Sequence, residues 1–182
     1  MSYVSKGAQR MSEMIGAVLS YSRLGHQGNP MMALDSTLAL DRALGDLRSV
    51  TGEAHAIIEW SPLPVVIADL VQLTQLFQNL VSNALKFRHP ARIPRISISA
   101  REEPGQWIFT VADNGVGMAQ SDHGVIFDLF QRVHPDRDVL GCGIGLAICK
   151  KIVEHHQGRI WVESQLDVGS SFHFSLPKER TP

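Results

Sequence analysis

The sequence predicts an α+β fold in which helices pack on a mixed, largely antiparallel sheet as a two-layer sandwich. Two observations lead to this fold class. Segments with a helical spacing of apolar residues are interspersed with short alternating segments, and hairpin turns are expected at Pro104-Gly105 and Asp167-Val168-Gly169. With 182 residues, 44% of them hydrophobic, the chain is long enough for one domain with a sizeable core and a short appendage.

The appendage is a helix expected over residues 8–24, which carries apolar residues at helical spacing. Gly25, Gly28 and Pro30 end it. A single amphipathic helix is not stable alone, so we expect it to pack on a partner helix, either in this chain or in a second copy. We therefore predict a helix and linker over residues 1–28 and one domain over 29–182, and we expect the chain to be part of a longer protein.

The first half of the domain is predicted to contain two helices and four strands. Asp35 or Ser36 caps a helix over residues 36–50. Its inward residues are expected to be Leu38, Leu40, Ala43, Leu44 and Leu47. Short apolar runs predict strands at 56–60 and 65–68, and a second helix follows over 69–88. Alternation predicts strands over 95–101 and 106–112.

The second half begins with an irregular stretch, within which residues 125–130 suit a short helix. Apolar residues at helical spacing predict a longer helix over 145–156, and two strands, 159–163 and 171–176, close the chain. Only Cys142 and Cys149 are present, without CxxC spacing, so neither a disulfide scaffold nor a zinc site is expected and a reducing cytoplasm is the default location. The eight histidines are scattered, which argues against a histidine metal site.

Charge and hydropathy exclude other classes of function. The net charge of −1 gives no support for nucleic-acid binding. No apolar run approaches the roughly 20 residues of a membrane span, so no membrane segment is expected in this chain, and no secretory leader is apparent.

The helix over residues 69–88 carries the strongest functional signal. One face is apolar, whereas Gln75, Asn79, Asn83 and Lys86 follow one another at three or four residues on another face. Asparagine is a poor helix former, so two asparagines one turn apart lower the stability of the helix. Their presence therefore favours a functional role for this face. Amide oxygens suit Mg²⁺, and a lysine one turn further can meet phosphate charge. The alternative is a solvated face that happens to contain two asparagines.

Two glycine-rich segments extend this signal. Asp113-Asn114-Gly115-Val116-Gly117 follows a strand, where Asp113 could accept a hydrogen bond from an adenine amino group and the glycines could let a ring lie close. A simple hairpin turn is the alternative. Gly141-Cys142-Gly143-Ile144-Gly145 precedes a helix, and a helix N-terminus favours phosphate. Residues 133–140 resemble a flap hinged on Gly141, although an ordinary flexible loop would read the same way.

Together these segments resemble the ATP-binding catalytic domain of sensor histidine kinases, within the gyrase–Hsp90–histidine kinase–MutL superfamily. QNLVSNALKF resembles the N box of that family, DNGVG its first glycine box, residues 125–130 its F box and GCGIGLAI its second glycine box. GSSFHFSLP is similar to its closing strand, and the resemblance covers residues 36–177. SNALKFRHP, GIGLAICKKIVEHHQGRIWVES and RMSEMIGAVLSYSRLG are especially similar to phytochrome-type (bacteriophytochrome) kinases.

The resemblance implies a Bergerat-type ATP-binding fold, preceded by one helix of a dimerisation hairpin over residues 1–28. It also implies a cytoplasmic protein histidine kinase that uses ATP and Mg²⁺ and is a homodimer at full length. The γ-phosphate would pass to a histidine on the upstream dimerisation helices and then to the receiver-domain aspartate of a response regulator.

Site roles follow from the same resemblance. Asn79 should bind Mg²⁺, and Lys86 and Arg132 should act on the phosphates as the catalytic residues, with Arg137 as an alternative arginine. Asp113 should accept from adenine. The remaining residues expected at the nucleotide are Asn83, Phe87, Gly115, Gly117, Gly141, Gly143, Gly145 and Leu146.

The sequence departs from the family pattern at two positions that bear on its function. None of the eight histidines has the expected acceptor context, a following Asp or Glu, then Leu and a proline, so the acceptor is expected upstream of this chain. Superfamily members that hydrolyse ATP carry a glutamate one turn before the magnesium asparagine, where this chain has Gln75, which cannot act as a base. The alternatives are a kinase-deficient or phosphatase-type module that positions the dimerisation helices and, less favoured, a chaperone- or topoisomerase-like ATPase.

Overall fold

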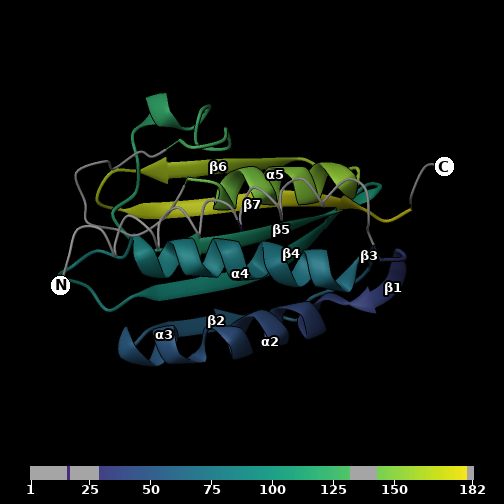
Figure 1. Cartoon of the computed structure of the whole chain (residues 1–182), viewed down its shortest axis with the longest axis horizontal. Coiled ribbons are helices and arrows are strands. Elements are labelled where there is room, and N and C mark those ends of the chain that lie inside the picture. The colour runs from purple at the N-terminus through teal and green to yellow at the C-terminus, as the bar shows by residue number, and fades with distance from the viewer. Residues whose placement is uncertain (1–15, 17–28, 132–142, 180–182) are drawn as a thin grey trace.

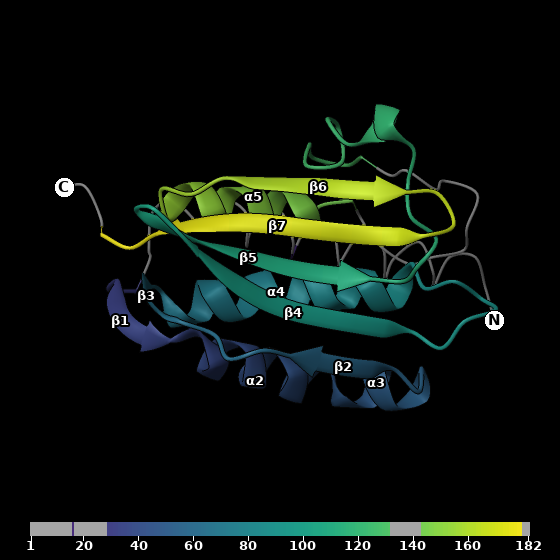
Figure 2. The same cartoon turned by 180° about the vertical axis from the view of Figure 1, so that it is seen from behind.

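The computed structural model describes residue 16 and residues 29–131 and 143–179, which form helices packed on one face of a five-stranded sheet. Helices α2, α4 and α5 lie in front of the sheet in Figure 1, and Figure 2 shows the opposite face, which no described helix covers. The helices are α2 (Ser36–Asp46), α3 (Arg48–Glu53), α4 (Leu70–Lys86) and α5 (Gly145–His155), with a 3-10 turn η1 (Gln120–Asp122). The predicted α+β two-layer class is confirmed.

The sheet has the strand order β2-β4-β5-β7-β6. Its strands are β2 (Ile57–Trp60), β4 (Arg95–Glu103), β5 (Gln106–Asp113), β6 (Ile160–Gln165) and β7 (Gly169–Pro177). Strand β2 pairs with β4 in parallel, and the other three pairs are antiparallel, so the sheet is mixed and largely antiparallel as expected. The sequence missed β1 (Met32–Asp35), which forms a separate antiparallel pair with β3 (Val65–Ala68).

Three phenylalanines join the two layers in the core. Phe77 of α4 meets Phe109 of β5 and Phe174 of β7 edge-on, with ring centroids 6.1 and 5.8 Å apart. The two strand residues are register partners, and their rings stack at 4.8 Å. All three side chains are fully buried. Such aromatic pairs add about 0.5–1.5 kcal/mol beyond their area burial, which fixes α4 over β5 and β7.

The first domain helix departs from the prediction. It is capped by Asp35, whose carboxylate accepts from the Thr37 amide at 2.9 Å, but it ends at Asp46 and a separate short helix, α3, follows. The expected inward position of Leu38 is wrong: Leu38 is exposed, and Ala39 occupies the buried position instead. The small alanine side chain allows close packing of α2, which also contacts α4.

The expected helix over residues 125–130 is also wrong. The only helical turn here is η1, and residues 123–130 form consecutive turns. Ile126 and Phe127 are nevertheless buried, with Phe127 packed edge-on against Phe172 at 6.4 Å. Ile126 and Phe127 therefore anchor these turns to the core, whereas Val125, Leu129 and Phe130 are exposed.

Some predictions lie outside the described residues. Of the helix expected over 8–24, only Gly16 is described, and it is helical. The flap at 133–140 and the residues Arg132, Arg137 and Gly141 also lie outside. Within the part of the chain that the structure describes, no helix is long and apolar enough to cross a bilayer.

Candidate functional site

Helix α4 presents the predicted polar residues along its exposed side. Asp69 caps it, its carboxylate accepting from the amides of Val71 and Gln72 at 2.8 and 3.3 Å. Eight buried residues fix the rotation of the helix, as the apolar stripe predicts. Gln75, Asn79 and Asn83 are consequently half-buried.

The C-terminal end of α4 carries Lys86 and Phe87. Lys86, in the last helical turn, is exposed, which leaves its ammonium group free to meet an anion. Phe87 is the C-cap, its amide bonded to the carbonyl of Asn83 at 2.9 Å. The Phe87 side chain is half-buried.

Asn79 faces helix α5. A Cβ placed on Gly145 would lie 3.6 Å from Oδ1 of Asn79, so the first turn of α5 passes directly beside the amide. The Nδ2 atom of Asn79 is buried and has no hydrogen-bond partner among the described residues. An unsatisfied buried amide of this kind costs about 1–3 kcal/mol, and such a cost is typical of a site that awaits a ligand.

Asp113 is the last residue of β5, as the sequence predicts. It pairs with Ser170 in the sheet, and its Oδ1 accepts the Gly115 amide at 2.8 Å. Burial raises the pKa of the Asp113 carboxyl, against the smaller lowering effect of backbone hydrogen bonds from Gly115 and Ser170. A desolvated carboxylate with spare acceptor capacity can bind an N–H donor such as an adenine amino group.

The glycines after Asp113 have a packing role that the sequence did not reveal. A Cβ on Gly115 would lie 2.5 Å from the Phe87 carbonyl oxygen, and one on Gly117 would lie 1.9 Å from the Gln165 carbonyl oxygen. Gly117 also has φ +63°. Hydrogen bonds from Val116 to Phe87 and from Asp167 to Val116 clamp the loop between α4 and the β6–β7 turn. These glycines are therefore required by contacts within the protein, whatever else approaches them.

Two residues of this region were given no role by sequence reasoning. The Asn114 side chain accepts from the Arg95 amide at 2.8 Å and donates to the Ile93 carbonyl at 3.0 Å, which ties the loop to the start of β4. The Ser164 hydroxyl accepts a hydrogen bond from the Met118 amide at 2.9 Å and donates one to the Gly169 carbonyl. An asparagine directly after a strand is typical of a turn, so the sequence could have indicated the role of Asn114. A serine within a strand has no such typical role, so the sequence did not indicate that of Ser164.

The second glycine segment leads into α5. Gly143 has φ +69°, and a Cβ there would lie 2.8 Å from the Gln131 carbonyl oxygen. The Phe130 amide donates to the Gly143 carbonyl at 3.0 Å, so the described ends on either side of residues 132–142 meet. The N-cap residue of α5, Ile144, makes no side-chain cap hydrogen bond, and a helix N-terminus of this kind favours an anion. Leu146 in the first turn is half-buried.

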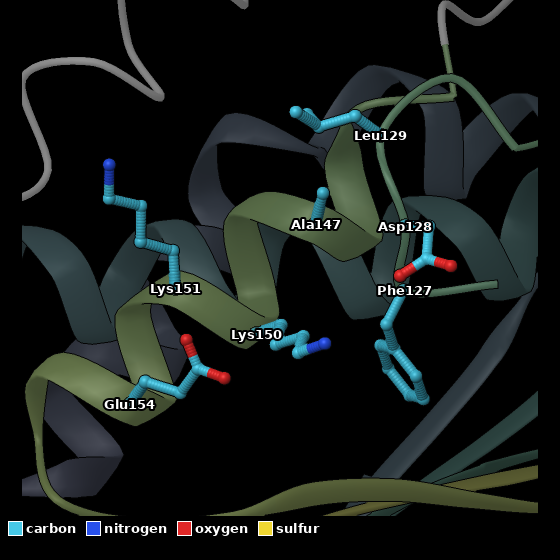
Figure 3. A pocket seen from close by; sticks show the side chains of 7 residues that line it. All are labelled: Phe127, Asp128, Leu129, Ala147, Lys150, Lys151 and Glu154. Carbon is cyan, nitrogen blue, oxygen red and sulfur yellow. The ribbon is translucent and has the colours of Figure 1, made fainter. Parts of the chain in front are cut away.

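The structure thus brings the predicted residues together at two places along α4, one beside the start of α5 and one beside the loop after β5. Asn79 contacts the start of α5, and Phe87 contacts the loop that follows Asp113. A separate pocket of about 320 Å³ lies on the other side of α5 and contains none of the predicted site residues. Figure 3 shows Phe127, Lys150 and Glu154 around it. Its mixed charges do not favour a polyphosphate, so we do not assign the nucleotide to it.

Comparison with known proteins shows the family to which the chain belongs. Residues 68–180 match the model of the family "Histidine kinase-, DNA gyrase B-, and HSP90-like ATPase". Cyanobacterial phytochrome A of Nostoc sp. (strain PCC 7120) is 45% identical over 97% of this chain, and phytochrome-like protein Cph1 of Synechocystis sp. (strain PCC 6803) is 40% identical over 94%. The chain spans only 23% of each of these relatives.

Solved structures of histidine kinases share the fold. The structure of full-length ShkA in complex with AMPPNP superimposes with a TM-score of 0.79 at 26% identity, covering 97% of this chain and 37% of that one. The mycobacterial sensor histidine kinase MprB gives a TM-score of 0.69 at 26% identity, over 83% of this chain and 99% of that one. The chain therefore belongs to the family of histidine kinase-, DNA gyrase B- and HSP90-like ATPases, as an ATP-binding module of the histidine kinase type.

Proposed function

We propose that this module binds Mg-ATP between α4 and α5 and transfers the γ-phosphate to a histidine outside this chain, for relay to a response regulator aspartate. The observation that carries the proposal is the half-buried carboxylate of Asp113, whose pKa is raised by burial, at the end of β5 beside the C-terminal end of α4. Adenine would donate its amino group to Asp113. The relatives named above are phytochromes, and ShkA was solved with the ATP analogue AMPPNP.

The residues of α4 fit the phosphate end of the nucleotide. Asn79 would hold Mg²⁺ through Oδ1, since Gly145 has no side chain to fill the space beside that oxygen. Mg²⁺ usually takes few protein ligands and keeps phosphate oxygens and waters. Accordingly, the described residues contain no group of three His, Cys, Asp or Glu side chains able to hold a metal alone. Bound Mg²⁺ would neutralise phosphate charge; Asn83 and Lys86 would orient the phosphates.

Gln75 favours transfer of the phosphate over hydrolysis of ATP. It lies on α4 one turn before Asn79, where a hydrolase needs a base that activates water. A glutamine amide cannot accept a proton at neutral pH. Transfer to a histidine nitrogen needs no such base from this chain, because a neutral imidazole is already a nucleophile.

Binding is tested first with this chain. Asp113→Asn should weaken ATP affinity in calorimetry, because an amide places a donor or a weaker acceptor opposite the adenine amino group. Lys86→Ala should weaken it as well, whereas Lys150→Ala, an exposed lysine on the far side of α5, serves as the matched control. Unchanged affinity in Asp113→Asn would remove this residue from the adenine site.

Transfer is then tested with a longer protein that includes the upstream helix pair. We expect label from γ-labelled ATP on that helix pair, less label with Lys86→Ala, and loss of label when the response regulator is added. A second candidate, nucleotide-dependent positioning of the dimerisation helices without transfer, is favoured if ATP binds and the full-length protein stays unlabelled.

A further inference from the structure

Three polar side chains lie in a row at one end of the helix-facing side of the sheet. The strand register places Ser164 of β6 opposite Ser170 of β7, and Ser170 opposite Asp113 of β5. Figure 2 shows these three strands side by side. The next row on the same face is apolar and buried, and consists of Ile98, Val111, Phe172 and Val162. The sheet therefore becomes polar where Asp113 is expected to meet the base.

The hydroxyl of Ser164 makes three hydrogen bonds. It accepts one from the Met118 amide and donates its only proton to the Gly169 carbonyl, both at 2.9 Å. The third contact joins it to the Ser170 hydroxyl, also at 2.9 Å. Because a serine hydroxyl has one proton, Ser164 must be the acceptor in this contact and Ser170 the donor. The bonds made by Ser164 thus fix the direction of the Ser170 O–H.

The direction of that O–H matters for Asp113. Residues directly opposite on antiparallel strands have Cβ atoms about 4.5–5.5 Å apart, so the Ser170 and Asp113 side chains are neighbours. Ser170 is buried, and a buried hydroxyl without Ser164 would need another acceptor, for which the carboxylate is the strongest choice. The carboxyl already accepts hydrogen bonds from the backbone of Gly115 and Ser170. A third donor would occupy a position that the adenine amino group needs.

We propose that Ser164 is a positioning residue of the adenine site: it binds the Ser170 O–H and so leaves the Asp113 carboxylate open to the amino group of adenine. This inference rests on the proposed role of Asp113. Ser164 acts through Ser170 and has no need to touch the nucleotide itself. An open carboxylate selects adenine over hypoxanthine, because hypoxanthine carries an oxygen in place of the amino group and two acceptors repel each other.

The first measurement is the pKa of the Asp113 carboxyl in the nucleotide-free chain, by NMR titration of the carboxyl carbon. In Ser164→Ala the Ser170 O–H should turn to the carboxylate, and the pKa should fall because a donor stabilises the charged form. Adding Ser170→Ala removes that donor and should return the pKa to the wild-type value. An unchanged pKa in Ser164→Ala, or an equal fall with and without Ser170, overturns the proposal.

The second measurement is the preference for ATP over inosine triphosphate, by calorimetry on the same chain. Ser164→Ala should lower this preference about 3- to 10-fold, the effect of one hydrogen bond. Ser164→Thr keeps the hydroxyl and should retain the preference. Ser175→Ala is the matched control: it removes a buried hydroxyl on the opposite face of β7, which accepts the Arg159 amide, and should change nothing.

The double variant separates a positioning role from a structural one. Ser164→Ala also leaves the Met118 amide without its acceptor, but this loss is the same whether or not Ser170 is present. Recovery of the preference on adding Ser170→Ala therefore supports the proposal, and equal losses in the two variants overturn it. If Asp113→Asn lowers the preference and Ser164→Ala does not, Ser164 has no positioning role and the proposed adenine site stands. If Asp113→Asn has no effect, the adenine site is wrong and the role of Ser164 toward the base is overturned with it.

Discussion

The backbone amide of Asp69 donates to Nε2 of His156 at 3.1 Å and so joins the start of α4 to the end of α5. Nδ1 of the same ring donates to the Ile152 carbonyl at 2.7 Å, an assignment that makes the imidazole neutral. The Asp69 carboxylate, which caps α4, also accepts the amide of Asn29, where the described domain begins. This link holds together the far ends of the two helices that carry the candidate site.

His156→Ala should therefore lower the free energy of unfolding by about 2–4 kcal/mol. The substitution leaves a cavity and an unsatisfied buried amide at Asp69. His155→Ala is the matched neighbour, because His155 is half-buried and its ring bonds only the Gln72 side chain among the contacts described. Urea unfolding followed by circular dichroism compares the two variants. Equal losses would show that the Asp69–His156 hydrogen bond has no special weight.

Asp113→Asn should stabilise the nucleotide-free protein at neutral pH while it weakens ATP binding. The raised pKa means that the folded state holds its proton to higher pH than the unfolded state does. Stability therefore falls as pH rises from the unfolded pKa through the folded one, and the full penalty is present above both. Removing the charge should gain roughly 0.5–2 kcal/mol. Thermal melts from pH 3 to pH 8 check this, since the advantage of the variant must vanish at the acid end.

Gly117→Ala should cost more than about 3 kcal/mol or prevent folding. The position has φ +63°, which is unfavourable for a residue with a side chain, and the added methyl would overlap the Gln165 carbonyl. Gly124→Ala is the control, because nothing lies within 4 Å of a Cβ there. If Gly117→Ala melts like the control, the described packing of the loop against the β6–β7 turn is incorrect.

His173 should make the domain less stable in mild acid. Burial lowers its pKa, an effect that Arg101 reinforces and Glu163 opposes. Below the usual histidine pKa the unfolded chain takes up a proton first, so stability falls as the pH drops from there to the lowered folded pKa. His173→Gln keeps a group that can bond Thr110 Oγ1, now 2.9 Å from Nδ1. Its stability should change less between pH 7 and pH 5, as chemical unfolding at each pH would show.

Strong periodicity made α4 predictable from sequence, with its start near Asp69 and with Asn79 and Asn83 on a face apart from the apolar one. The end of β5 at Asp113 lies one residue beyond the end that alternation predicts. By contrast, β1 was missed because four residues are too few to show a period, and its pairing with β3 is a tertiary contact. The hydrogen bond between Asp69 and His156 joins two helices across 87 positions, so no local pattern could reveal it.

The hydrogen bond from Phe130 to Gly143 fixes the two ends of an eleven-residue segment, 132–142, next to each other. Adding residues to a loop whose ends already meet changes its closure entropy only slowly, by about 0.6 kcal/mol for each doubling in length. Because Phe130 and Gly143 already meet, a longer or shorter sequence between them would change the closure entropy of this connection by little. Variation in its length is therefore expected to have a small entropic cost for the fold.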